Sequence, residues 1–215
     1  MTSGHPILKS KLSLLERYER AMEGAFGNGS LCPVLSTDRL RLRMPHPDDI
    51  DFLVELDTDQ AVMKHINDGP MSASQARLYA ETIIELAPRR AHLHRWTIEH
   101  LDGTGRLGWI ELSKYRGERK RADLSDDIQL AYELSPAAWG CGYTTEAGHA
   151  GLKHAFETLK RLDRVVAYVR PDNLRSVRVL EKLRFIPDGV CRNEMARAYS
   201  FYVLPIERWR ESYAG

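Results

Sequence analysis

Two glycines one residue apart, Gly140 and Gly142, stand between a strand-like run and a run that favours a helix. The first turn of a helix has free backbone N–H groups, and the helix dipole adds positive charge there. A loop with few side chains at this junction can therefore bind a phosphate group through main-chain donors. The loop has no Lys or Arg, so binding would depend on amides and on the hydroxyls of Tyr143, Thr144 and Thr145. Such a site suits a pyrophosphate better than a reacting γ-phosphoryl group.

Two familiar phosphate-binding motifs do not occur in the sequence. A P-loop requires a glycine-rich run that ends in Gly-Lys-Ser or Gly-Lys-Thr, and the chain has none. A dinucleotide fingerprint requires a third glycine at position 145, which is occupied by Thr145. Nucleoside triphosphates and NAD are therefore disfavoured as ligands, and a turn without any ligand remains the alternative.

Two polar residues follow the next predicted strand. Asn173 begins a helix directly after that strand, where an Asn side chain can cap the free N–H groups of the first turn. Ser176 lies one turn further along, where its hydroxyl is either solvated or able to donate a proton. Taken singly, each residue has a structural explanation.

The hydrophobic patterns predict the elements that position these residues. Strands are expected at 39–44, in two runs at 92–101 and 106–115 on either side of a DGTG turn, at 128–134 and 164–169, and in two closing runs at 185–190 and 198–204. Helices are expected at 48–58, 72–87, 144–160 and 173–183. This order predicts an α/β fold of the α+β type, with a single mixed central sheet flanked by helices.

Length and composition indicate one main domain. The chain has 215 residues, of which 43% are hydrophobic, enough for one sizeable core. We expect this domain to span 35–215 and to follow a helical extension and linker at 1–34. Apolar residues at helical spacing over 7–26 predict an amphipathic helix, which we expect to pack on the domain or on a second copy, as in a homodimer.

The bulk charge and the cysteines exclude several classes of protein. Lys and Arg number 31 against 30 Asp and Glu, so the net charge of +1 gives no general attraction to nucleic acid or to an anionic membrane. The 3 cysteines are odd in number and widely spaced, which favours a reducing compartment. No apolar run is long enough to span a membrane or to serve for export, so we expect a cytoplasmic protein. The histidine pairs 92/94 and 149/154 lack a third ligand, and no metal is expected.

Three segments together resemble a known family. WGCGYTTEAGHAGLKHAFETL, VVAYVRPDN and NLRSVRVLEKLRF are similar, in this order, to the acetyl-CoA signature of the GNAT N-acetyltransferase superfamily. They lean toward the branch typified by bacterial ribosomal-protein N-terminal acetyltransferases. The resemblance covers residues 35–205 and implies a GNAT-like acyl-CoA N-acyltransferase fold that uses acetyl-CoA as a co-substrate.

The resemblance also implies roles for individual residues. The family's phosphate loop matches 137–142, so the cofactor-binding residues would be Leu134, Gly140, Cys141, Gly142, Tyr143, Thr144, Thr145 and Asn173. The pantetheine arm would enter between the strands 128–134 and 164–169, which the family fold splays apart. Asn173 would contact this arm, and Ser176 would protonate the departing thiolate.

The chain departs from the family pattern at three places. Ala137 replaces the usual Gln or Arg of the loop, and Arg184 stands where the helix usually ends in Gly. The strand has Gln-Leu-Ala-Tyr at 129–132 in place of an acidic residue followed by Ile-Gly-Tyr. The catalytic base is therefore open; Glu133 is our candidate, with Asp126, Asp127 and Glu111 as rivals.

These features predict direct acetyl transfer from acetyl-CoA to a primary amine, either a protein N-terminal α-amine or a small-molecule amine. A site with a weak base handles an α-amine more easily than a lysine, because the pKa of an α-amine lies closer to neutrality. Two alternatives remain: an acetyltransferase that acts on aminoacyl-tRNA, and a non-catalytic module that senses acyl-CoA.

Overall fold

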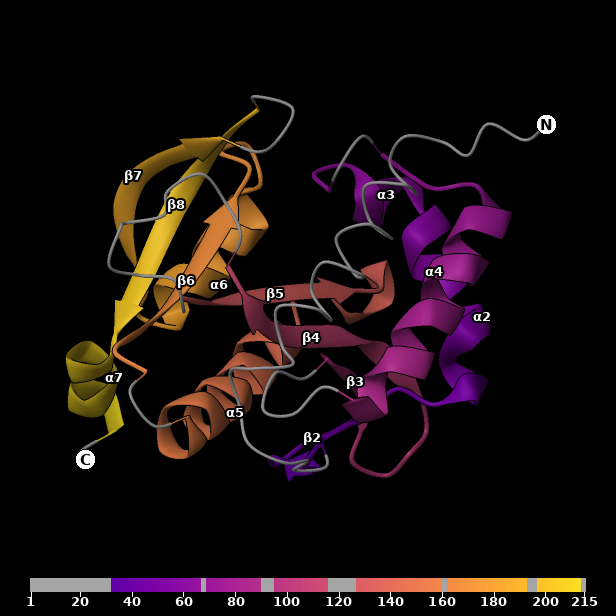
Figure 1. The fold of residues 1–215 in the computed structure, drawn as a ribbon, viewed down its shortest axis with the longest axis horizontal. Coiled ribbons are helices and arrows are strands. Elements are labelled where there is room, and N and C mark those ends of the chain that lie inside the picture. Colours follow the sequence, from indigo (N-terminus) through magenta and orange to yellow (C-terminus); the bar gives the residue numbers. More distant parts are fainter. Residues whose placement is uncertain are drawn as a thin grey trace.

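The computed structural model describes residues 32–66, 69–89, 95–115, 127–159, 162–192 and 197–213. Residues 1–31 of the expected helical extension lie outside these ranges. In the described part of the chain, the strands form one mixed sheet in the order β1-β2-β3-β4-β5-β6-β8-β7 (Figure 1). The strands are β1 Leu35–Ser36, β2 Leu40–Arg43, β3 Arg95–His100, β4 Arg106–Lys114, β5 Ile128–Leu134, β6 Arg164–Val169, β7 Ile186–Arg192 and β8 Ala198–Pro205.

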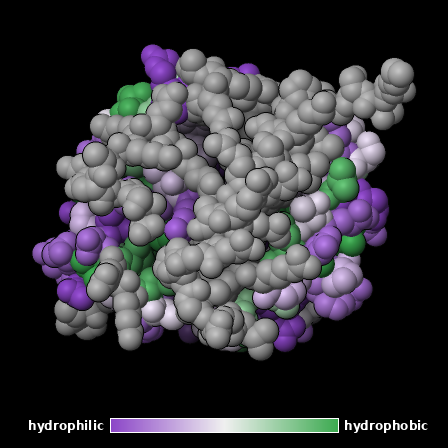
Figure 2. Space-filling model, in the orientation of Figure 1, coloured by the Kyte–Doolittle hydropathy of each residue, from purple (hydrophilic) through white to green (hydrophobic). Residues whose placement is uncertain are grey.

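Helices and short 3-10 turns connect the strands. The helices are α2 Ile50–Thr58, α3 Gln60–Met63, α4 Ala73–Leu86, α5 Tyr143–Thr158, α6 Leu174–Lys182 and α7 Ile206–Tyr213. The 3-10 turns are η1 Pro47–Asp49, η2 Ala87–Arg89 and η3 Pro136–Ala138. In the described ranges, no helix is both long and apolar enough to cross a membrane. The described surface visible in Figure 2 mixes hydrophilic and hydrophobic residues.

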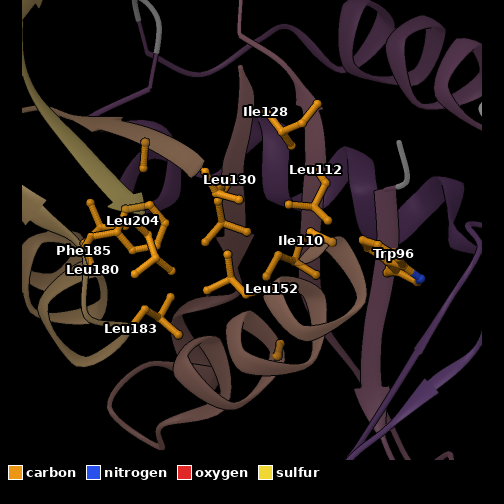
Figure 3. Packing of buried hydrophobic residues seen from close by; sticks show 14 of the residues in the cluster. Trp96, Ile110, Leu112, Ile128, Leu130, Leu152, Leu180, Leu183, Phe185 and Leu204 are labelled. Atoms are coloured by element: carbon orange, nitrogen blue, oxygen red, sulfur yellow. The ribbon is translucent and has the colours of Figure 1, made fainter. Parts of the chain in front are cut away.

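The two faces of the sheet are covered by different helices. Side chains alternate along a strand, so Ile110 of β4 and its cross-strand partner Tyr132 share one face, while Trp109 and Glu133 share the other. On the first face Leu152 of α5 lies in the main core together with Ile110 (Figure 3). On the second face Trp109 packs with residues of α2, α3 and α4. The helix at the glycine loop and the α2–α4 group therefore lie on opposite faces.

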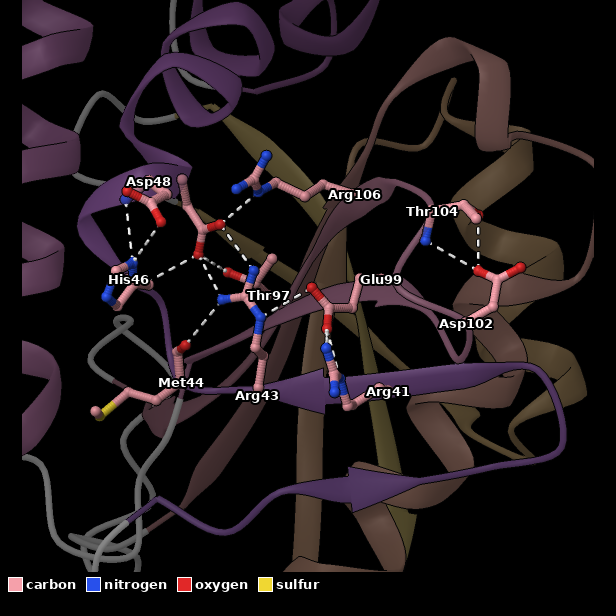
Figure 4. Close-up of polar contacts among 11 residues, drawn as sticks. Arg41, Arg43, Met44, His46, Asp48, Thr97, Glu99, Asp102, Thr104 and Arg106 are labelled. Atoms are coloured by element: carbon pink, nitrogen blue, oxygen red, sulfur yellow. Dashed lines mark hydrogen bonds and ion pairs between the residues drawn. The ribbon is translucent and has the colours of Figure 1, made fainter.

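A buried cluster of polar residues fastens β2, η1, β3 and β4 together. The Asp49 carboxylate is fully buried and accepts two hydrogen bonds from Arg43, at 2.8 and 2.9 Å. It also accepts from Arg106 at 2.5 Å and from the hydroxyl of Thr97 at 3.0 Å (Figure 4). We call Arg41, Arg43, Asp49, Thr97, Glu99 and Arg106 the Asp49 cluster.

Most of the predicted elements are present. β5 and β6 have the predicted bounds, and α2, α4, α5 and α6 differ from prediction by one or two residues at an end. The strand predicted at 92–101 begins at Arg95 in the described residues, since 92–94 lie outside them. Three elements were not predicted: the short β1, the single-turn α3, and α7 after Pro205.

Candidate cofactor and acceptor site

The glycine loop is built by left-handed backbone at two positions. Gly140 has a φ of 79° and Gly142 a φ of 81°, values that L-residues with a side chain rarely adopt. Gly142 is the residue that directly precedes α5, so the chain turns sharply from η3 into the helix. The glycines therefore leave the first turn of α5 uncovered by side chains at the loop.

The amides of this loop are unused within the described part of the chain. Among the described residues, none accepts a hydrogen bond from a backbone N–H of residues 140–145, whereas the N–H of Glu146 already bonds to the carbonyl of Gly142 at 3.1 Å. Cys141 and Gly142 are exposed, and Tyr143 is half-buried. The loop thus presents a row of free donors at the positive end of a helix of 16 residues, which fits an anionic group.

Glu146, the acidic residue in the first turn of α5, is turned toward the connection between β1 and β2. Its carboxylate accepts hydrogen bonds from the Thr37 hydroxyl, from the backbone N–H of Arg39 at 3.1 Å and from Nε of Arg39 at 2.7 Å. Burial alone would raise the pKa of Glu146, but these hydrogen bonds outweigh it and the pKa lies below its ordinary value. Its negative charge is therefore engaged by Arg39 rather than by the loop amides.

Arg39 also holds the loop itself. Its guanidinium donates to the carbonyl of Cys141 at 3.1 Å and lies 4.6 Å from the ring centre of Tyr143. Sequence reasoning missed this role, because Arg39 lies more than 100 positions before the loop. Nothing local in the sequence distinguishes this arginine from Arg41 and Arg43 of the strand that follows it.

β5 and β6 separate directly beside the loop. They pair in parallel only at Ile128 with Val165 and at Gln129 with Val166, whereas β6 pairs with β8 along its whole length. Figure 1 shows the two strands diverging toward their carboxyl ends. The splay that the family resemblance implied is therefore present.

The peptide groups along one edge of β5 face this gap. The carbonyl of Asp127 and the N–H of Ser135 both bond to residues on the β4 side. Peptide groups alternate in direction along a strand, so those of Leu130, Tyr132 and Leu134 point the other way, toward the gap. The Leu134 carbonyl accepts a hydrogen bond there from the Trp139 indole at 2.8 Å.

The start of α6 lies on the other side of the gap. The side chain of Asn173 accepts a hydrogen bond from the N–H of Ser176 at 3.3 Å, which confirms its role as N-cap. The carbonyl of Ser176 accepts from the hydroxyl of Tyr132 in β5 at 3.3 Å. The structure thus brings Asn173, Ser176 and β5 together.

The candidate bases that the structure describes occupy two different environments. The two carboxylate oxygens of Asp127 accept hydrogen bonds from Nε and Nη2 of Arg164, at 2.9 and 2.6 Å, near the closed end of the gap. Glu111 and Glu133 both lie on the face covered by α2 and α4. Asp126 lies outside the described residues.

Glu111 and Glu133 surround a buried arginine. Nε of Arg95 donates to Glu111 at 2.6 Å, and the guanidinium lies 3.8 Å from the ring centre of Trp109. Burial would lower the pKa of Arg95, but the charges of Glu111 and Glu133 help to hold it above its ordinary value. This is the face opposite α5.

Aromatic residues line the same face across the gap. Tyr168 of β6 is 44% exposed and packs against Tyr115 and Tyr199 at ring-centre distances of 6.0 and 5.3 Å. A molecule bound on this face would therefore meet carboxylates from β4 and β5 and aromatic rings from β6 and β8. In the described ranges, no group of three side chains is arranged to hold a metal ion.

Comparisons with known proteins agree with this geometry. The family described as "Acetyltransferase (GNAT) domain" matches residues 39–186. An uncharacterized N-acetyltransferase of Bacillus licheniformis is 29% identical over 183 residues, which cover 84% of this chain and 98% of that protein.

Two solved structures show the same fold. An acetyltransferase of the GNAT family from Bacillus anthracis aligns with a TM-score of 0.67 at 23% identity, covering 81% of this chain and 99% of that one. The aminoglycoside acetyltransferase AAC(6')-Ib, solved with paromomycin and acetyl-CoA, aligns with a TM-score of 0.66 at 15% identity and covers 81% of this chain and 98% of that one.

Proposed function

The chain belongs to the GNAT family of acetyltransferases, and on this premise we propose that it transfers an acetyl group from acetyl-CoA directly to a primary amine, either a protein N-terminal α-amine or the amine of a small molecule. The observation that carries the proposal is the row of unused amides at residues 140–145 beside the gap between β5 and β6. Acetyl-CoA would be the co-substrate: when bound, it supplies the acetyl group as an activated thioester.

The residues of the loop and of the gap have separate tasks in this proposal. The amides of residues 141–145 would hold the pyrophosphate, aided by the dipole of α5. The amide nitrogen of Asn173, the backbone groups of Leu130 and Tyr132 on the gap side of β5, and the N–H of Leu134 would hold the pantetheine arm. An N–H of that β5 edge is also suited to stabilise negative charge that develops on the reacting carbonyl oxygen.

Ser176 and Glu133 are proposed to handle protons. Ser176 stands beside the gap at the start of α6, where its hydroxyl can donate a proton to the leaving sulfur. Glu133 lies on the opposite face, where an amine would approach. Asp127 is a poor alternative, because its two oxygens are engaged by Arg164 at the closed end of the gap.

The pKa of the acceptor limits the reaction when the base is weak. At pH 7.4 an α-amine with a pKa near 8 is about one-fifth neutral, and a lysine near 10.4 about one-thousandth neutral. That difference corresponds to about 3 kcal/mol. The chemistry therefore favours an α-amine or a small amine of low pKa, and AAC(6')-Ib gives a precedent for small-molecule acceptors on this fold.

The test is a mass-spectrometric acetylation screen of the purified protein with acetyl-CoA. The panel contains N-terminal peptides, lysine peptides, amino acids, polyamines, aminoglycosides and aminoacyl-tRNA. We expect acetylation of an α-amine or a small amine, and not of lysine peptides. Acetylation of aminoacyl-tRNA alone, or tight acetyl-CoA binding without turnover of any amine, would contradict the proposal.

A further inference from the structure

The glycine loop lacks a side-chain cation of its own. Position 137, where the family usually has Gln or Arg, is Ala137, and the nearby Arg39 has its charge offset by Glu146. Coenzyme A carries a pyrophosphate, which is strongly anionic. The amides and the helix dipole supply only partial charges, so a full positive charge at the loop would have to come from another element.

Arg175 of α6 is held beside the loop by an aromatic contact. Its guanidinium carbon lies 4.5 Å from the ring centre of Trp139, the residue directly before Gly140. The Trp139 ring is fixed in turn, because its indole N–H donates to the carbonyl of Leu134 at 2.8 Å. Trp139 follows β5 and Arg175 lies just after β6, so this contact spans the two sides of the gap.

The stacked arrangement leaves the guanidinium able to bind an anion. A guanidinium that lies over an aromatic ring keeps the N–H donors at its edge free. Arg175 is exposed, and within the described residues no carboxylate forms an ion pair with it. Its charge is therefore available, and its orientation is partly fixed before any ligand binds.

The position of Arg175 within α6 is unfavourable for the helix. It is the second residue of the helix, whose first turn has no acidic residue. A cation at this end opposes the helix dipole and destabilises the helix. An anion bound near this helix end would offset that effect.

We propose that Arg175, oriented by Trp139, is the side-chain cation that binds the pyrophosphate of coenzyme A in this protein, in place of the Gln or Arg that position 137 lacks. The inference rests on the proposed function and adds a residue from α6 to the loop amides. It also links both sides of the gap to the same ligand.

The test is isothermal titration of coenzyme A into the wild type, Arg175→Gln and Arg178→Gln. Arg178 is an exposed arginine on the same helix and serves as the matched control. We expect Arg175→Gln to weaken binding by about tenfold or more, as for loss of a hydrogen bond to a charged group, and Arg178→Gln to change it by less than about twofold. The melting temperature of Arg175→Gln should equal or slightly exceed that of the wild type. If Arg175 had only a structural role, the melting temperature would fall.

Two ligand analogues assign the contact. Dephospho-coenzyme A keeps the pyrophosphate and lacks only the 3′-phosphate, so the loss in Arg175→Gln should persist with it. Acetyl-pantetheine lacks the pyrophosphate, so its turnover should be equal in the wild type and Arg175→Gln. Unchanged coenzyme A affinity in Arg175→Gln, or a loss that disappears with dephospho-coenzyme A, would overturn the inference. Failure of the wild type to bind coenzyme A would instead contradict the proposed function.

Discussion

The Asp49 cluster and the glycine loop are both rich in hydrogen-bonding groups, but only the cluster satisfies them internally. Asp49 is completely buried, and its carboxylate accepts from Arg43, Arg106, Thr97 and the N–H of His46. The amides of residues 140–145 have no acceptor among the described residues and lie in a partly exposed loop. Satisfied groups stabilise a fold, whereas aligned free donors at a surface are available to a ligand.

The difference shows how to separate structural from functional polar residues in this chain. The Asp49 cluster has charges of both signs that match one another across β2, η1, β3 and β4. At the loop, the one carboxylate of the first turn, Glu146, is held away by Arg39. A mutation in one region should therefore change stability, and a mutation in the other should change ligand binding.

The largest expected effect comes from Gly142→Glu in the loop. The variant places a carboxylate and a side chain where the pyrophosphate would lie, and we expect acetyl-CoA affinity to fall at least about 1000-fold, or about 4 kcal/mol. Gly103→Glu is the matched control, because Gly103 also has a positive φ of 76° but lies in the hairpin turn between β3 and β4. Titration calorimetry should show normal affinity in the control. Unchanged affinity in Gly142→Glu would remove the phosphate assignment.

The converse change is Asp49→Ala, which should affect stability and not binding. Removing one partner from a buried ion-pair cluster leaves Arg43 and Arg106 without this acceptor, so we expect the free energy of unfolding to fall by about 3 kcal/mol. Urea unfolding measures this loss. The affinity for acetyl-CoA, measured where the variant is still folded, should stay within about twofold of the wild type. A selective loss of affinity at unchanged stability would contradict the division between the two regions.

The Asp49 carboxylate should also make the stability of the fold depend on pH. Burial would raise the pKa of Asp49, but hydrogen bonds from Arg43, His46 and Arg106 hold it well below its ordinary value. A carboxyl with a lowered folded-state pKa stabilises the fold above the unfolded-state pKa of about 3.9, and this contribution is lost as pH falls below that value. When the pH falls from about 6 to about 3, the free energy of unfolding should therefore fall less in Asp49→Ala than in the wild type. Urea unfolding at each pH measures the two losses.

Ser176→Ala separates turnover from cofactor binding within the site. Ser176 is proposed to act on the leaving group, so we expect kcat to fall about 10- to 100-fold while acetyl-CoA affinity is nearly unchanged. Steady-state kinetics together with calorimetry separates the two effects. Wild-type turnover in this variant would exclude Ser176 as the proton donor.

The smallest expected effect is at a strained residue without a proposed role in binding. Arg184 follows α6 with a φ of 69°, in the left-handed region where Gly has no steric penalty. Its side chain is not needed for the contact with Arg208, which donates to the backbone carbonyl of Arg184 at 2.8 Å. Arg184→Gly should therefore raise the free energy of unfolding by about 1 kcal/mol in urea titrations. A loss of stability would show that the arginine side chain contributes more than the strain costs.

Local patterns in the sequence predicted the parts of the fold that depend on neighbouring residues. The bounds of β5 and β6 follow from short apolar runs between turns, and Asn173 was identified as an N-cap from its position alone. α3 was missed because it has only four residues, fewer than two turns of hydrophobic periodicity. The splay of β5 from β6 came from the family resemblance and not from either strand.

Contacts between distant segments could not be predicted in this way. Arg39 meets Glu146 and the glycine loop, and Arg175 meets Trp139, across intervals that no periodic pattern describes. The position of Glu146 in the first turn of α5 does not reveal that Arg39 engages its carboxylate. The roles of Glu133, Ser176 and the loop residues remain predictions, of which Ser176→Ala and Gly142→Glu test two.

The most direct measurement of the central claim is a crystal structure of the protein with coenzyme A. We predict that pyrophosphate oxygens lie about 3 Å from backbone nitrogens of residues 141–145, with the pantetheine arm in the gap between β5 and β6. Electron density for coenzyme A at another part of the molecule, with the loop amides bound only to water, would contradict the account.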